Sequence, residues 1–184
     1  MDLSHVSVQT MHDVLSHSLA PPFFSHSSAY TIHKHERNVP DSVLKRLRST
    51  DGVVMINFYK QFVSGDRDCT VNDVAKHVLH VARIAGWKYP PFPNETADDR
   101  HVGIGSDFDG IDARCKDIED TSMYPNLIAE VLRQAPETCD EEIRGFLGEN
   151  LLRVWEKAEK VRDSLKSQRP SEDLWDGRTM KYQP

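Results

Sequence analysis

Short apolar runs alternate with amphipathic stretches along most of the chain. The clearest strand is predicted over residues 52–59, "GVVMINFY", an unbroken apolar run typical of a strand that is buried on both faces. Three shorter strand-like runs are "MDLSHV", "APPFFSHS" and "RHVGIGSDFDG", at residues 1–6, 20–27 and 100–110. The pattern therefore predicts four strands.

Amphipathic segments follow each predicted strand. Helices are expected over residues 7–18 with Ser7 as N-cap, over 38–50, over 70–86, and throughout most of the chain after Pro125. A proline-rich loop is expected over 87–99. The resulting βαβαβαβα order is typical of parallel strands joined by crossover helices. Two α/β architectures fit this order, an open doubly wound sheet and part of a (β/α)₈ barrel.

Composition narrows the class of protein. The formal net charge is −6, from 23 Lys and Arg against 29 Asp and Glu, and nucleic-acid binding needs a basic surplus instead. No apolar run approaches the roughly 20 residues of a spanning helix, and neither a signal-peptide nor a lipid-anchor pattern is recognised. We therefore expect a globular protein without a membrane segment and without a nucleic-acid partner.

The three cysteines, Cys69, Cys115 and Cys139, are odd in number and far apart. They form no CxxC pair, so we expect neither a disulfide framework nor a thiolate zinc site. Without a disulfide, a reducing compartment is the default, and this favours the cytoplasm. The localisation is otherwise unknown.

Each predicted strand ends in a polar residue that can bind or react. His5, His26, Tyr59 and Asp107 occupy these positions. In parallel α/β folds, the carboxyl ends of the strands are where sites are assembled. Two imidazoles that meet there could bind zinc, and a neighbouring carboxylate could move a proton.

Five motifs extend this interpretation to a family. "DLSHVS", "FSHSSA", "RNVPD", "NFY" and "GSDFDG", in this order over about residues 2–162, resemble the C-terminal half of the membrane (renal-type) dipeptidases. These are zinc metallopeptidases with an amidohydrolase-like barrel. The resemblance implies the last four βα units of a TIM-like (β/α)₈ barrel, and a zinc-dependent hydrolysis of dipeptides.

The resemblance also implies roles for individual residues. His5 and His26 match the ligands of the second zinc in a two-metal site, and Arg37 matches the arginine that holds the terminal carboxylate of the substrate. Asp107 matches the catalytic aspartate, which also contacts the substrate, and Tyr59 matches a pocket-lining tyrosine.

Part of the family pattern is not found in this sequence. The HxD pair of the first strand and the glutamate that bridges the metals are missing, so the ligands present serve one of the two zinc ions. We expect a partial barrel domain over residues 1–162 and a polar tail over 163–184. Four strands cannot close a barrel, so a complementing N-terminal half or a homodimer is the expected partner. Another amidohydrolase-type C–N hydrolase and a non-catalytic, truncated pseudoenzyme remain the alternatives.

The remaining candidates have simpler interpretations. His33 and His35 are expected to be solvated loop residues, and His77 and His80 to form a surface face of a helix without an HExxH motif. Residues 107–119 resemble a calcium loop only superficially, because the glycine falls at the fourth position instead of the sixth.

Overall fold

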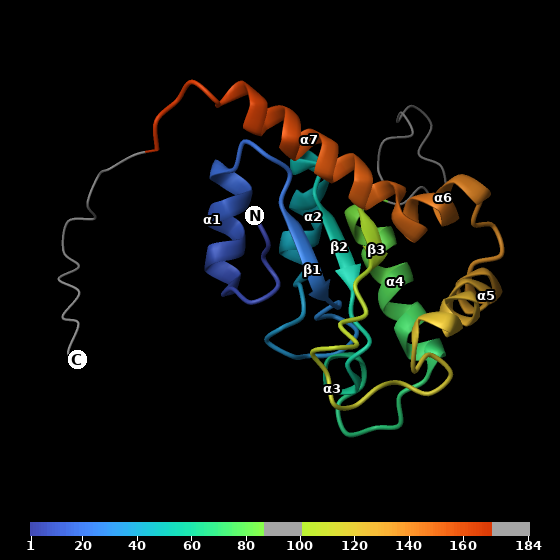
Figure 1. The fold of residues 1–184 in the computed structure, drawn as a ribbon. Helices are drawn as coiled ribbons and strands as arrows, with labels where there is room; N and C mark the ends of the chain where they lie inside the picture. The colour runs from blue at the N-terminus through green and yellow to red at the C-terminus, as the bar shows by residue number, and fades with distance from the viewer. Residues whose placement is uncertain (87–100, 171–184) are drawn as a thin grey trace, which may run out of the picture.

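The fold is built on a parallel sheet whose strands follow one another in chain order (Figure 1). The computed structural model describes residues 1–86 and 101–170. The strands are β1 (Phe23–Ser27), β2 (Val53–Ile56) and β3 (Val102–Ile104), in the order β1-β2-β3. Asp2 forms a further parallel bridge to Phe23 beside β1. Three of the predicted strands, within residues 20–27, 52–59 and 100–110, and the α/β class with parallel strands are therefore confirmed. The predicted strand over residues 1–6 forms the single bridge at Asp2 and is not a strand of the described sheet.

Helices alternate with these strands as the sequence predicts. They are α1 (Val8–His17), α2 (Asp41–Thr50), α3 (Lys60–Val63), α4 (Val71–Ala85), α5 (Tyr124–Gln134), α6 (Asp140–Arg144) and α7 (Asn150–Ser164), with a 3₁₀ turn η1 (Thr121–Met123) and a π turn η2 (Gly145–Glu149). The Ser7 side chain caps α1 by accepting a hydrogen bond from the backbone N–H of Thr10, as expected. Gly86, with a φ of 110°, ends α4 in the left-handed conformation.

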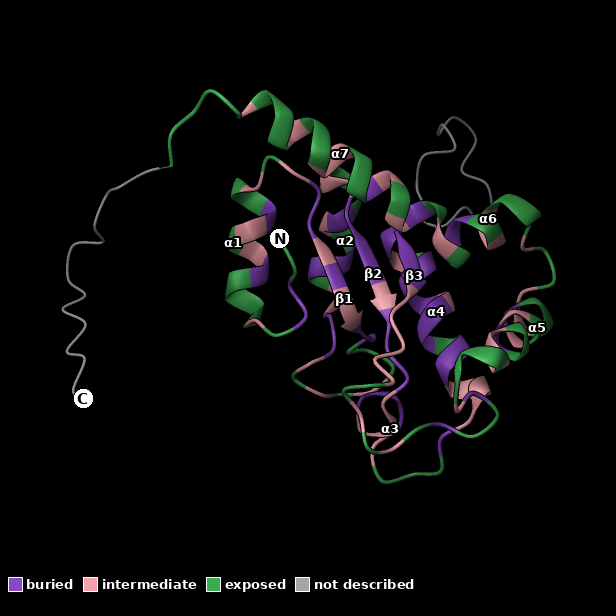
Figure 2. Ribbon diagram, in the orientation of Figure 1, coloured by how far each residue is buried: buried purple, intermediate pink, exposed green. Residues whose placement is uncertain are grey.

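The helices cover one face and one end of the sheet. α4 packs on β2 and β3, and α2 packs on α4 and α1, so the buried residues concentrate between these helices and the strands (Figures 1 and 2). α7 crosses the starts of β2 and β3, where Asn150 donates a hydrogen bond of 2.8 Å to the Val102 carbonyl and Arg153 pairs with Asp51. The opposite, carboxyl ends of the strands are not covered by α7.

Two histidines of α4 are buried, so their interpretation as a surface face is wrong. His77 accepts a hydrogen bond from the Ala29 N–H at Nδ1 (2.9 Å) and donates one from Nε2 to the Val63 carbonyl (3.0 Å). His80 Nε2 lies 2.8 Å from Asp41. The helical periodicity could not reveal this burial, because α4 is covered by α2 and α5 as well as by the sheet.

A disulfide joins Cys69 to Cys115, so the expectation of no disulfide is wrong. The two residues are 46 positions apart, and a parallel bridge between Thr70 and Lys116 brings their neighbours together. Sequence spacing alone could not show this long-range pairing. Because disulfides persist mainly in oxidising environments, the cysteine pattern no longer supports a reducing compartment.

Two expectations fall largely outside the described residues. The proline-rich segment 87–99 lies there entirely, and most of the predicted tail, 163–184, lies there as well. The division into a domain and a tail therefore stays a prediction. In the parts that the structure describes, no helix is both long enough and apolar enough to span a bilayer.

We expect one free thiol in the folded, unreduced protein, on the exposed Cys139. Alkylation without reductant should therefore add one label to the intact mass, and alkylation after reduction and denaturation should add three. Three labels without reductant would contradict the disulfide.

We expect the free energy of unfolding to decrease as the pH is lowered from 6.5 to 4, because the pKa of His77 is lowered in the folded protein. Burial lowers the pKa of this imidazole to about 4, whereas the unfolded chain binds the proton near pH 6.5. The stabilisation is complete above pH 6.5 and is lost as the pH falls towards 4, by at most about 3 kcal/mol. Urea unfolding across this range should show a shallower pH dependence for His77→Gln, which keeps a donor and an acceptor. A matched change at the exposed His17 should keep the wild-type slope, and an equally steep His77→Gln profile would refute this assignment.

Candidate active site

The register between the first chain segment and β1 brings two histidines together. Asp2 is paired with Phe23, and the Leu3 N–H donates to the Phe23 carbonyl at 2.9 Å. His5 and His26 each follow their paired residue by three positions. Their Nε2 atoms accordingly lie 2.8 Å apart, with ring centroids separated by 4.9 Å. The structure thus places these side chains side by side, and their role as metal ligands remains a prediction.

Asp107 approaches the histidines from beyond the end of β3. Its Oδ2 atom lies 3.9 Å from His26 Nε2. The residue has a φ of 63°, and the turn is closed by a hydrogen bond of 2.9 Å from the Gly110 N–H to the Asp107 carbonyl. A Cβ atom at Gly110 would collide with the Asp107 carboxylate. Gly110 therefore provides the space in which this carboxylate lies.

Arg37 lies beside the same strand ends, and one of its guanidinium nitrogens has no hydrogen-bond acceptor among the described residues. Its Nε atom donates to the Ser4 carbonyl at 2.6 Å, and its guanidinium carbon is 5.0 Å from the centre of the Phe62 ring. Nη2 is buried without a hydrogen-bond partner within the described residues. Burial lowers the pKa of Arg37 although Asp107 opposes the shift, so an incoming anion would find a desolvated cation with a free donor.

Tyr59 reaches this cluster through Phe62. Its ring meets the Phe62 ring edge-on at 4.8 Å, and its hydroxyl is hydrogen-bonded to Asp112. Burial and the Asp112 carboxylate raise the pKa of Tyr59. Tyr59 therefore connects to the surroundings of Arg37, and its expected place in the pocket wall stays a prediction.

His35 also packs on Phe62, at 4.5 Å between ring centres, and its Nδ1 accepts a hydrogen bond of 3.1 Å from the Arg37 N–H. Both His35 and His33 are partly buried, so the expectation of solvated histidines is wrong in this respect. Sequence reasoning missed Phe62, and its position three residues after Tyr59 at the start of a helix was the available signal.

Two further residues support His26 from the side opposite His5. Ser25 Oγ lies 2.6 Å from His26 Nδ1 and 2.5 Å from Asp2 Oδ2. The other oxygen of Asp2 accepts backbone N–H bonds from Ser25 (3.0 Å) and Ser4 (3.1 Å). Burial alone would raise the pKa of Asp2, but these hydrogen bonds outweigh it and the pKa is lowered. Sequence reasoning missed both residues, although Asp2 and Ser25 stand within the motifs that carry the histidines.

The local environment favours a neutral His26. Burial is the main cause of its lowered pKa, with Arg37 and His5 acting in the same direction and Asp107 opposing them. A neutral imidazole keeps a nitrogen lone pair, which is the form that binds metals.

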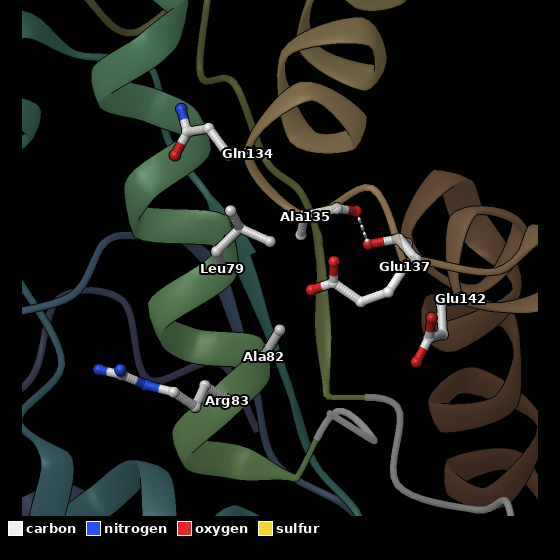
Figure 3. Close-up of a pocket in the computed structure, with 8 residues that line it drawn as sticks. Leu79, Ala82, Arg83, Gln134, Ala135, Glu137 and Glu142 are labelled. Carbon is white, nitrogen blue, oxygen red and sulfur yellow. Dashed lines mark hydrogen bonds between the residues drawn. The ribbon is translucent and has the colours of Figure 1, made fainter. Parts of the chain in front are cut away.

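Two cavities differ in their relation to this cluster. A cavity of about 660 Å³ lies beside the cluster and is lined by His5 and Arg37 together with residues of α1 and of the loop before α2. A second cavity, of about 300 Å³, lies between α4, α5 and α6 (Figure 3). Its wall is formed by Leu79, Ala82, Arg83, Gln134, Ala135, Glu137, Thr138 and Glu142. It includes no residue from a strand end, so the first cavity is the one associated with the candidate site.

The described residues supply part of a metal site. His5 and His26 provide two nitrogen donors, which suit zinc. Nowhere in residues 1–86 and 101–170 do three or more His, Cys, Asp or Glu side chains form a group that could hold a metal ion. Because catalytic zinc is typically held by three protein ligands, the pair fits zinc as one portion of a donor set.

The fold and the cluster together define the class of protein. The crystal structure of an amidohydrolase from Pseudomonas aeruginosa shares this fold, with a TM-score of 0.69 over 85% of the chain and 51% of its own length, at 24% identity. The chain is thus an α/β protein that shares its fold with this amidohydrolase structure.

The family follows from the sequence. The pattern that defines the family described as Membrane dipeptidase (Peptidase family M19) matches residues 1–169, and the chain belongs to this family of metallopeptidases. Two uncharacterised dipeptidases of Schizosaccharomyces pombe are similar, at 46% identity over 99% of the chain and 43% over 90%. The chain spans 41% and 37% of their respective lengths.

A solved relative carries a bound ligand. The crystal structure of a metallopeptidase from Rhodobacter sphaeroides, liganded with a phosphinate mimic of the dipeptide L-Ala-D-Ala, is 28% identical. It matches with a TM-score of 0.69 over 85% of this chain and 41% of its own.

We expect Gly110→Ala to displace the Asp107 carboxylate without unfolding the protein. The added methyl group meets the end of a side chain, which can rotate away, so the free energy of unfolding should change by about 1 kcal/mol or less. The ¹³C shift of the Asp107 carboxyl group should change, whereas Gly148→Ala, which meets open space, should leave it unchanged. An unaltered Asp107 signal in Gly110→Ala would contradict the close approach.

Proposed function

We propose that this chain contributes to a zinc-dependent dipeptidase, which hydrolyses the peptide bond of dipeptides. The observation that supports this most strongly is the cluster at the strand ends. Two imidazoles lie 2.8 Å apart, the Asp107 carboxylate lies 3.9 Å from one of them, and the nearby Arg37 keeps a buried, unpartnered Nη2. Metal binding, proton transfer and carboxylate recognition are the three operations that such a reaction needs.

Each residue has a distinct proposed role. His5 and His26 would hold zinc, which supplies Lewis-acid polarisation of the carbonyl group and activation of a water molecule. Asp107 would accept a proton from the attacking water and deliver it to the leaving amine. Arg37 would bind the free carboxylate of the substrate through Nη2, because a guanidinium matches a carboxylate in geometry and charge.

The substrate class follows from the position of Arg37. A single cavity of about 660 Å³ is lined by both His5 and Arg37, so a ligand could reach the metal-binding side and the arginine at the same time. A free carboxylate bound so close to the reacting carbonyl is a property of short peptides. The dipeptide mimic bound by the Rhodobacter sphaeroides relative supports this choice.

The architecture we propose is the C-terminal half of a (β/α)₈ barrel. β3 and the Asp2 segment are the two edges of the described sheet, and Phe23 and Met55 on the strands are only partly buried. Further parallel strands would pair with these edges and would bring the remaining ligands of a two-zinc site. A complementing N-terminal half is the partner that fits best, with a second copy of the chain as the alternative.

We expect Arg37→Ala to lower kcat/KM for dipeptides by about 10- to 150-fold, the loss typical of a hydrogen bond to a charged group. The assay would use the full chain with zinc and with the partner that completes its site, and dipeptides with free and amidated carboxyl groups. Only the free-carboxylate substrates should lose rate. The matched control is Arg48→Ala, an exposed arginine of α2, which should retain wild-type rates.

Two results would contradict the proposal. Equal rates for wild type and Arg37→Ala on free dipeptides would exclude the carboxylate role. Turnover of amidated or lactam substrates in preference to free dipeptides would favour another C–N hydrolase, and a chain that binds no zinc and turns over nothing would be the pseudoenzyme.

A further inference from the structure

We propose that Asp2 and Ser25 are positioning residues that hold His26 in a single tautomer, with the proton on Nδ1 and the lone pair on Nε2. This inference deepens the proposed function, since it concerns how one of the proposed zinc ligands is oriented. It rests on a continuous chain of short hydrogen bonds behind the imidazole, which runs from the His26 ring through the Ser25 hydroxyl to the Asp2 carboxylate.

The far end of this chain is fixed by backbone groups. Asp2 Oδ1 accepts the N–H of Ser25 at 3.0 Å and the N–H of Ser4 at 3.1 Å, one from β1 and one from its own segment. The carboxylate therefore spans the two paired segments, and its second oxygen, Oδ2, is directed at the Ser25 hydroxyl at 2.5 Å. The position of Asp2 is set by the pairing of the segments and not by His26.

Counting protons determines the direction of the hydrogen bonds. A serine hydroxyl has one proton to donate, and an ionised carboxylate can only accept. The 2.5 Å separation between Ser25 Oγ and Asp2 Oδ2 therefore requires that Ser25 donates to Asp2. Ser25 then has only lone pairs to offer His26, and the 2.6 Å bond between them requires a proton on Nδ1 of the imidazole.

The remaining nitrogen of His26 is thereby left as an acceptor. Without a metal, His26 Nε2 accepts the Nε2–H of His5 at 2.8 Å. Every hydrogen bond in the series His5, His26, Ser25 and Asp2 is therefore donated in the direction of Asp2. Because Ser25 donates to Asp2, the opposite tautomer would place two acceptors, His26 Nδ1 and Ser25 Oγ, against each other. The lone pair of His26 Nε2 consequently lies on the side of His5 and Asp107, where the proposed function needs a metal-binding electron pair.

A second contact restrains the backbone of His26. Its N–H donates to Ser4 Oγ at 2.9 Å. Ser25 Oγ has no better acceptor than Asp2, because Ser4 Oγ lies farther away, at 3.4 Å. The hydroxyl of Ser27, two residues further along β1, donates to Ser4 Oγ at 3.3 Å instead of bonding to the imidazole. Ser27 is therefore a matched control on the same strand.

The first test reads the tautomer in the metal-free protein. Long-range ¹H–¹⁵N correlation spectra of the histidine-labelled full chain should show His26 with its proton on Nδ1. Ser25→Ala and Asp2→Asn should give a mixture of tautomers, Ser25→Thr should restore the wild-type spectrum, and Ser27→Ala should not change it. Circular dichroism would verify that each variant is folded.

The second test reads zinc affinity by competition with a chromophoric chelator. Loss of a supporting hydrogen bond behind a ligating histidine typically weakens metal binding by about 10- to 100-fold. We expect this loss for Ser25→Ala and Asp2→Asn, and wild-type affinity for Ser25→Thr and Ser27→Ala.

Several results would overturn the inference. These are a wild-type His26 with its proton on Nε2, a Ser25→Ala variant with the wild-type tautomer, or variants that bind zinc as tightly as wild type. If the wild-type chain binds no zinc, the metal-binding part of the proposed function fails instead, and the tautomer in the metal-free protein alone decides the positioning role.

Discussion

The parallel pairing between the segment at Asp2 and β1 is the constraint on which the candidate site depends. Asp2 opposes Phe23, and an equal advance of three residues on both segments delivers His5 and His26 to the same place. A slip of one residue would turn every side chain of one segment to the other face of the sheet. The same pairing places the Asp2 carboxylate behind His26. Strand register thus sets both the proposed ligand pair and its support.

The surrounding fold stabilises the loops at the carboxyl ends of the strands. His77 joins the backbone of Ala29, which follows β1, to that of Val63 at the end of α3. The disulfide between Cys69 and Cys115 ties the start of α4 to the segment that follows Asp107. α7 occupies the opposite end of the sheet, where Asn150 binds the start of β3. These contacts stabilise the loops at the carboxyl ends of the strands, and α7 does not cover those ends.

Sequence patterns predicted β1, β2, β3 and the main helices, and they singled out the polar residues that the structure brings together. Hydrophobic periodicity predicted the strands, and the geometry of parallel sheets then predicted that His5, His26 and Asp107 would approach one another. Contacts that depend on tertiary packing were not accessible in this way. The burial of His77 required knowledge of what covers α4, and the hydrogen bonds of Ser25 required the register of β1.

The most direct test of the account is X-ray absorption at the zinc edge on the zinc-loaded full chain. The account predicts scattering from two imidazole rings bound through nitrogen at about 2.0–2.1 Å. Replacing either His5 or His26 by alanine should remove one ring, while His17→Ala should remove none. A zinc environment without imidazole scattering, or one that is unchanged in both histidine variants, would contradict the convergence of these two side chains on a metal.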